Sequence, residues 1–259
     1  MEINEKEDIT NNKDNKTIDT KKYNIIKVEK DEVIANFNDI TYKVILIGDP
    51  NVGKESIIQN LINESKPNCG EYKPTIGFDI FNYSAHVNEK IITMQIWDTC
   101  GLMDFCTCTP TLFKNTSLAI IVYDISNKYS FENLENWIHL IESNCNNKPL
   151  FFVVGNRKGP ERKVTTEEGK KFTQEHNFDF FIEFSAEEKQ FENIIFEQAL
   201  AQLYELYNNY KKKDIFDDDD DDNEYEGERI DFSKRRGTFK LNIIKSNNNH
   251  KNKTNKKMC

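Results

Sequence analysis

Apolar residues in this chain of 259 residues gather in its central part, in two kinds of pattern. Short continuous apolar runs are typical of strands buried on both faces of a parallel sheet. Such runs cover residues 44–47, 118–123 and 150–154. Residues 78–87 and 91–97 instead alternate apolar and polar side chains around Asn88 and Glu89. This alternation predicts an antiparallel hairpin that turns at those two residues.

Between the strands, apolar residues recur at helical spacing. One such helix is expected to follow Ser130, which can serve as its N-cap. Two more helices are expected at residues 165–176 and 191–210, the last with Ile194, Ile195, Leu203 and Leu206 inward. Alternating strands and helices predict an α/β fold, a doubly wound and mostly parallel sheet with ligands at the carboxyl ends of its strands. The apolar face of the first helix consists of Phe131, Leu134, Trp137, Ile138 and Ile141.

Composition divides the chain into one domain and two polar ends. Apolar residues make up 37% of the chain and charged residues 31%. Residues 1–38 and 214–259 show little apolar periodicity, so we expect a flexible N-terminal extension and a disordered C-terminal tail. Residues 39–213 hold enough apolar residues for a single α/β core.

The net charge of −9 hides a sharp division within the tail. An acidic spacer with the run Asp217 to Asp222 precedes residues 229–259, where ten Lys and Arg face one acid, Asp231. A basic tail after an acidic spacer suits a tether to an anionic membrane surface, although the two halves could also pair internally. Phe232 and Phe239 are the only Phe, Tyr or Trp residues of this tail, and so few aromatics argue against nucleic acid as the partner. No apolar run is long enough to span a bilayer, and we expect a cytosolic protein.

The candidate chemistry begins directly after the first apolar run. A loop with glycines at both ends and a lysine at its close, set between a strand and a helix, turns backbone N–H groups toward one point. Such a loop is suited to a di- or triphosphate, and its usual form has Ser or Thr after the lysine to bind Mg²⁺. The candidate residues are Gly48, Asp49, Pro50, Asn51, Val52, Gly53, Lys54, Glu55 and Ser56.

Seven segments in the same order resemble the small GTPases of the Ras superfamily. The Thr-Ile-Gly-x-Asp and Gln-Ile-Trp-Asp-Thr sequences resemble the Rab branch in particular, and the likeness extends from about Tyr42 to Leu206. It implies a P-loop small G-domain with a six-stranded sheet. The segments begin at Gly48, Tyr72, Ile96, Ile121, Ser130, Gly155 and Ser185.

The resemblance also implies the ligands, GTP or GDP with Mg²⁺, and a role for each matching residue. Thr75 would bind Mg²⁺ and the γ-phosphate, Asp98 would act behind a metal-bound water, and the Gly101 N–H would contact the γ-phosphate. Loss of that phosphate would release two loops, the usual order–disorder switch. Gly48, Gly53 and Lys54 would cradle the β- and γ-phosphates, and the base would meet Asn156, Arg157, Ser185, Ala186 and Glu187.

Five departures from the family fall on this chemistry. Glu55 replaces the Ser or Thr and could still ligate Mg²⁺, since that ion favours oxygen ligands, while Ser56 points elsewhere on the helix. Leu102 occupies the place of the Gln that orients the attacking water, which predicts crippled hydrolysis. Gly159 lacks the carboxylate that reads guanine, and Glu187 replaces a lysine. The aromatic that covers the base is missing near Asn68.

Two functions remain open at this stage. The first is a Rab-like switch in vesicle trafficking that hydrolyses GTP very weakly and meets effectors through residues 72–82 and 101–114. The second is a pseudo-GTPase that presents a fixed Rab-like surface. Rab-type regulators are further expected partners. A prenyl group on Cys259 together with the basic tail would hold the protein on the cytosolic face of an endomembrane.

Overall fold

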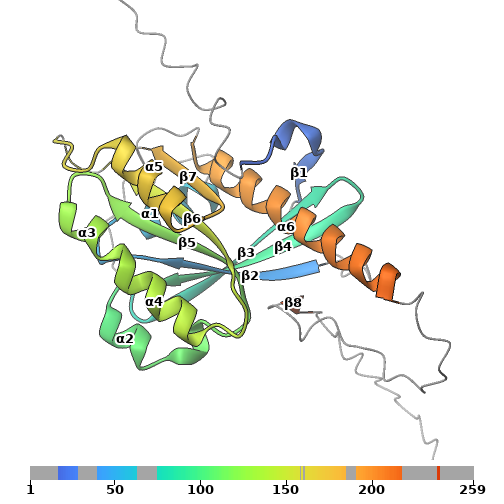
Figure 1. The fold of residues 1–259 in the computed structure, drawn as a ribbon, viewed down its shortest axis with the longest axis horizontal. Coiled ribbons are helices and arrows are strands. Elements are labelled where there is room, and N and C mark those ends of the chain that lie inside the picture. Colours follow the sequence, from blue (N-terminus) through green and yellow to red (C-terminus); the bar gives the residue numbers. More distant parts are fainter. Residues whose placement is uncertain are drawn as a thin grey trace, which may run out of the picture.

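A mixed β-sheet forms the centre of the molecule (Figure 1). The computed structural model describes residues 17–28, 40–62, 75–157, 159, 161–184, 191–217 and 238–239. The strands lie in the order β1-β3-β4-β2-β5-β6-β7, with β8 beside β2. They are β1 (Ile25–Lys27), β2 (Ile40–Ile47), β3 (Phe78–Val87), β4 (Lys90–Thr99), β5 (Thr116–Asp124), β6 (Leu150–Asn156), β7 (Phe180–Phe184) and β8 (Thr238–Phe239).

The pairing confirms the doubly wound, mostly parallel sheet. Strand β2 runs parallel to both β4 and β5, and β6 continues the parallel order between β5 and β7. Strands β3 and β4 form the expected antiparallel hairpin, and Asn88 at its turn has φ 55°. The sheet exceeds the expected six strands because β1 and β8 add to it from outside the expected domain, residues 39–213.

Helices cover both faces of this sheet (Figure 1). Because successive strand residues point to opposite faces, Val44 and Leu46 of β2 pack toward α1 and α6, and Ile45 and Ile47 pack toward α2 and α4. The helices are α1 (Lys54–Ile62), α2 (Met103–Thr107), α3 (Lys128–Glu132), α4 (Leu134–Asn144), α5 (Thr166–Glu175) and α6 (Phe191–Asp217), with short 3₁₀ turns η1 (Thr20–Lys22) and η3 (Pro110–Leu112). Of the described helices, none is both long and apolar enough to cross a bilayer.

The helix expected after Ser130 begins earlier and is divided in two, so the prediction of that N-cap is wrong. The N-cap of α3 is Asn127, whose side chain accepts from the backbone N–H of Tyr129. Ser130 is buried inside α3, where its hydroxyl donates to the Asn127 carbonyl at 2.8 Å. In contrast, α5 begins as expected, because Thr165 and Glu168 cap it reciprocally.

The N-terminal extension contributes strand β1 and a segment, residues 18–23, that contacts α6 and is called the N-terminal strap here. Strand β1 pairs antiparallel with β3 at the sheet edge. The hydroxyl of Tyr23 donates to Glu205 Oε1 on α6 at 2.7 Å. The backbone N–H of Ile18 donates to Gln198 Oε1 at 3.2 Å. Residues 17–28 therefore belong to the folded unit, which departs from the expected boundary at residue 39.

Candidate nucleotide-binding site

The candidate loop turns away from β2 at a position that only glycine fits. Gly48 has φ 142°, and a Cβ there would lie 2.2 Å from the carbonyl oxygen of Val122 on β5. A side chain would therefore push the loop off the neighbouring strand. Gly53, immediately before α1, also has a positive φ of 102°. These two residues let the chain curl between the end of β2 and the start of α1.

Lys54 is the first residue of α1 and closes this loop. Its side chain is fully buried, and its Nζ donates to the carbonyl oxygens of Gly48 at 3.0 Å and Asp49 at 2.8 Å. Burial lowers the pKa of Lys54, while the nearby carboxylates of Glu55 and Asp98 oppose that shift. The ammonium group thus lies inside the loop at the amino end of α1, an arrangement that suits an anion because the first N–H groups of a helix have no partner within the helix.

Asp49 anchors the loop to the opposite helix layer, an interaction that the sequence did not reveal. Its Oδ1 accepts from the indole Nε1 of Trp137 at 2.7 Å and from Nδ2 of Asn133 at 2.5 Å. Trp137 is fully buried on α4. No local signal marks this contact, because the partners lie more than 80 residues apart along the chain. The side chain of Asp49 therefore fixes the loop against Asn133 and α4.

Thr75 brings two carboxylates together beside the amino end of α1. Its Oγ1 lies 3.3 Å from Oε1 of Glu55 and 3.2 Å from Oδ2 of Asp98. Both acids are buried, with 7% of Glu55 and 2% of Asp98 exposed. The other oxygen of each, Glu55 Oε2 and Asp98 Oδ1, is buried and has no hydrogen-bond partner among the described residues. Buried polar atoms normally have one, so this corner can accept further donors or a cation.

The electrostatics of Asp98 reflect this crowding. The pKa of Asp98 is raised to about 7, chiefly by burial and next by the negative charge of Glu55. Lys54 and the hydrogen bond from Thr75 act in the opposite direction. The two carboxylates are therefore mutually unfavourable unless a positive charge or a proton joins them.

Gly101 brings the segment after β4 against the loop. It has φ 76°, and a Cβ there would lie 2.6 Å from Lys54 Nζ and 2.7 Å from the Gly48 carbonyl oxygen. The backbone of Gly101 is thus packed directly on the lysine. The next residue, Leu102, precedes α2 and is 56% exposed. The structure therefore gathers six predicted residues in one place: Gly48, Lys54, Glu55, Thr75, Asp98 and Gly101.

Of the residues expected to meet the base, the structure describes Asn156 and Arg157. Asn156, at the end of β6, is fully buried and donates from Nδ2 to the Val52 carbonyl at 2.8 Å, which ties β6 to the phosphate loop. Its Oδ1 has no hydrogen-bond partner among the described residues. Arg157 donates its backbone N–H to the Phe184 carbonyl at 2.7 Å, but its side chain is exposed. These contacts hold the two base-side strands together.

The space of the missing carboxylate at Gly159 is occupied. A Cβ at Gly159 would lie 2.7 Å from Oγ and 2.8 Å from Cβ of Ser126. The Ser126 hydroxyl in turn donates to Asp124 Oδ1 at 2.6 Å. Asp124 is the last residue of β5, so Ser126 is fixed against the loop that contains Gly159. A side chain at residue 159 would therefore collide with Ser126, so both the missing carboxylate and the position of Ser126 set this part of the site apart from the family pattern.

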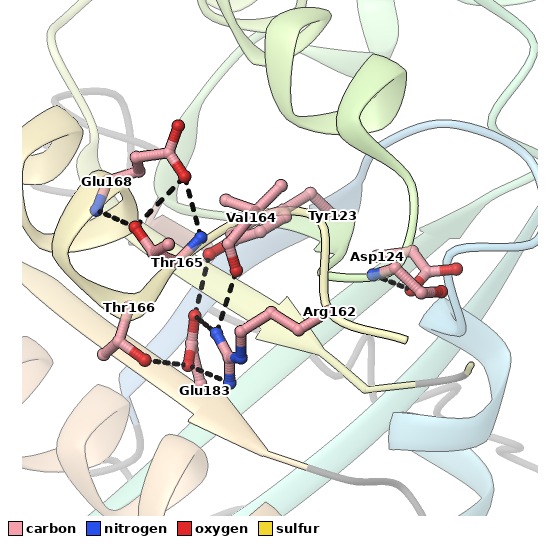
Figure 2. Close-up of polar contacts among 9 residues, drawn as sticks. Tyr123, Asp124, Arg162, Val164, Thr165, Thr166, Glu168 and Glu183 are labelled. Atoms are coloured by element: carbon pink, nitrogen blue, oxygen red, sulfur yellow. Dashed lines mark hydrogen bonds and ion pairs between the residues drawn. The ribbon is translucent and has the colours of Figure 1, made fainter. Parts of the chain in front are cut away.

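A second cluster, missed by the sequence analysis, ties the base-side loop to β7 (Figure 2). Arg162 makes a bidentate ion pair with Glu183, at 3.0 and 2.9 Å. Thr166 donates to the same carboxylate at 2.7 Å, and Tyr123 lies 3.4 Å from it. Arg162 also donates to the Val164 carbonyl. This network fixes the segment that follows residue 157 against the strand that precedes residue 185.

The remaining predicted residues lie at the tip of the loop, on α1 or outside the described part of the chain. Pro50 and Asn51 are exposed at the tip of the loop, and Asn51 has φ 62°. Ser56 is half-buried one position along α1. Ser185, Ala186, Glu187, residues 72–74 and Cys259 lie outside the described residues.

Comparison with known proteins identifies the family. The model of the Ras family matches residues 43–205. The Ras-related protein RABA1g of Arabidopsis thaliana is 36% identical over 183 residues, which are 70% of this chain and 82% of that protein. RABA1f of the same plant is 34% identical over the same shares, and Rab11B of Nicotiana tabacum is 32% identical over 65% of this chain and 77% of its own. The chain therefore belongs to the Ras family and is a Rab-like small GTPase.

Proposed function

We propose that this protein is a guanine-nucleotide switch of vesicle trafficking that hydrolyses GTP very slowly. The observation that carries the proposal is the contrast within one pocket. Lys54 and Gly101 are packed against each other as a phosphate site requires, while the next residue, Leu102, has only an apolar side chain to offer. A leucine can neither donate to nor accept from a water molecule, so it cannot align one for attack on a terminal phosphate.

The phosphate end of the pocket fits a nucleotide with Mg²⁺. Backbone N–H groups at the start of α1 and the buried ammonium of Lys54 suit phosphate oxygens. The unpartnered oxygens of Glu55 and Asp98 suit a hard cation. A bound GTP–Mg²⁺ supplies the phosphoanhydride and the ion that neutralises its charge. The protein residues would bind and position this complex, and the apolar side chain of Leu102 could not activate a water molecule.

A surface for effectors lies next to this pocket. The side chains of Ile76, Phe78 and Ile80 are 96%, 37% and 45% exposed, within the expected effector segment 72–82. Phe78 stacks on Trp97 with ring centroids 5.1 Å apart. Exposed apolar side chains of this kind mark an interaction site. This surface supports effector binding as the output of the switch.

Lys43 connects that surface to the second effector segment, 101–114. Its Nζ lies 4.0 Å from the Trp97 ring centroid and donates to the carbonyl oxygens of Thr111 and Lys114 at 3.4 and 3.2 Å. Burial lowers the pKa of Lys43 to about 8. A movement of either segment would disturb this group, so Lys43 couples Trp97 to the segment that follows Gly101.

The alternative, a pseudo-GTPase, is favoured by a specific observation at the base end. Ser126 occupies the space beside Gly159 where a guanine-reading carboxylate would need room. A bidentate base contact contributes about 1–3 kcal/mol of discrimination. Under this alternative the protein presents the Phe78 surface without a nucleotide cycle. Regulators that act on the GTP-bound or GDP-bound form would then have no such form to act on.

Membrane attachment completes the proposed function. The basic tail and Cys259 provide the two signals that lasting attachment requires, a polybasic patch and one prenyl chain. The protein would then sit on the cytosolic face of an endomembrane, where Rab-type regulators and effectors act. A radiolabelled isoprenoid incorporated into the wild type but not into Cys259→Ser would support this part of the proposal.

The discriminating experiment is analysis of the nucleotides released from the purified protein, together with melting curves. GTP at 100 times its Kd should add about 2.7 kcal/mol to the free energy of unfolding. An Mg²⁺-dependent shift with GTP or GDP supports the switch. The absence of a shift with GTP, GDP and ATP alike would refute nucleotide binding and leave the pseudo-GTPase.

A further inference from the structure

The corner formed by Glu55, Thr75 and Asp98 holds more negative charge than its contacts neutralise. The hydroxyl of Thr75 faces both carboxylates, at 3.3 and 3.2 Å, but it has one proton and can donate to only one of them at a time. Lys54 is close, yet its Nζ donates to the Gly48 and Asp49 carbonyl oxygens. At least one of the two acids therefore faces this corner without a hydrogen-bond donor.

The orphaned oxygens are not at the surface, where water would satisfy them. Glu55 and Asp98 are both more than nine-tenths buried, and each keeps one oxygen with no hydrogen-bond partner among the described residues. An unpaired buried carboxylate is costly. Two carboxylates that approach one hydroxyl from different elements, the start of α1 and the end of β4, are a typical donor set for a hard divalent cation.

We propose that Glu55, Asp98 and Thr75 form a divalent-cation site that binds Mg²⁺ or Mn²⁺ before any nucleotide is present. Three protein oxygens would hold the ion and water would complete its coordination. Mg²⁺ commonly binds with one or two carboxylates and several waters, and the harder oxygen ligands also suit Mn²⁺. The inference deepens the proposed function and rests on it for the identity of the pocket.

The consequence is an order of binding. A Ser or Thr at position 55 would bring no charge, so the ion would depend on the phosphates for its affinity. Glu55 brings a negative charge to the amino end of α1, where it repels phosphate until a cation compensates it. In this protein the cation prepares the pocket for the anion. Nucleotide binding should therefore fall more steeply on addition of EDTA than it does in Glu55→Ser.

The test uses Mn²⁺ and the full-length protein freed of nucleotide. Mn²⁺ broadens NMR signals of nearby amides, so the location of the ion can be determined directly. The proposal predicts broadening at residues 54–56, 75 and 98–101. The acidic run at residues 217–222 can also attract cations, and broadening confined to that run would overturn the proposal.

Matched variants decide whether Glu55 is a ligand. Glu55→Gln keeps the shape and removes the charge, and Glu142→Gln removes an exposed carboxylate from α4 as the control. Loss of a residue that only supports a metal ligand typically costs about 10–100-fold in affinity. Because Glu55 is proposed to bind the ion directly, Glu55→Gln should weaken Mn²⁺ binding at the pocket at least about tenfold. Unchanged broadening of the pocket amides in Glu55→Gln would contradict the assignment. Its amide spectrum reports whether the variant is folded.

The outcomes separate this inference from the proposed function. Mn²⁺ binding at the pocket without any GTP-dependent shift would sink the switch and leave the cation site. GTP binding in a protein whose pocket amides ignore Mn²⁺ would sink the cation site and leave the switch.

Discussion

Restoring an aspartate at residue 159 should not by itself restore guanine recognition. A Cβ at that residue meets Ser126 Oγ at 2.7 Å and Ser126 Cβ at 2.8 Å, closer than such atoms approach in proteins. Overpacking of this kind costs about 1–3 kcal/mol. The guanine contact that the carboxylate would add contributes about 1–3 kcal/mol. Because the two terms are of similar size and opposite sign, Gly159→Asp alone should change GTP affinity by less than about tenfold.

Removal of the obstructing side chain should release the gain. Ser126→Gly eliminates both close atoms, at the cost of the hydrogen bond to Asp124. In the double variant only the favourable term remains, so GTP affinity should rise by roughly 5–150-fold, which corresponds to about 1–3 kcal/mol. Ser126→Gly alone is the control and should leave GTP affinity unchanged.

Calorimetric titration of the three variants with GTP, GDP and ATP provides the measurement. The double variant should gain affinity for the guanine nucleotides and none for ATP, because the adenine edge lacks the two donors that a carboxylate accepts. Two results would refute the reasoning. One is a gain in Gly159→Asp as large as in the double variant, and the other is an equal gain for ATP. Melting curves verify that each variant is folded.

Three further predictions concern other parts of the molecule. Leu102→Gln combined with Glu55→Ser should raise single-turnover GTP hydrolysis, and no gain would show that other groups are missing. A double-mutant cycle of Asp49→Ala with Trp137→Phe should give a coupling of about 1.5–3 kcal/mol in urea unfolding, since a buried hydrogen bond to a charged group is lost; zero coupling would contradict the anchoring of the loop. Tyr23→Phe removes the bond to Glu205 and should lower the melting temperature by roughly 2–4 °C, about 1 kcal/mol for a domain of this size, whereas an unchanged temperature would mean that the N-terminal strap adds no stability.

The sequence predicted the parts of the site that depend on local pattern. The continuous apolar run before Gly48 marked a buried strand, and the helix starting at Lys54 followed from the same stretch. The hairpin of β3 and β4 and the helix that begins after Thr165 were also predicted, because the alternating and helical patterns that indicate them are local in the sequence. Each of these features depends on residues close together in the sequence, so the local pattern is enough to predict it.

The remainder depends on contacts between distant segments. Asp49 meets Trp137 across 88 positions and Arg162 meets Glu183 across 21, and nothing in either segment alone specifies the partner. The N-cap was misassigned at Ser130 because a serine can also turn inward and bond to the backbone three residues earlier, as it does here. Tyr23 joins the fold through α6, where its hydroxyl donates to Glu205 and its ring packs against Tyr204.

The rate at which bound GTP is hydrolysed in a single turnover tests the central claim most directly. The claim is that a phosphate-binding loop is retained while the groups that align water and read guanine are replaced. The account predicts hydrolysis slower than about 10⁻⁴ s⁻¹, below the unassisted rate typical of small GTPases. Rapid hydrolysis that excess ATP fails to inhibit would contradict it.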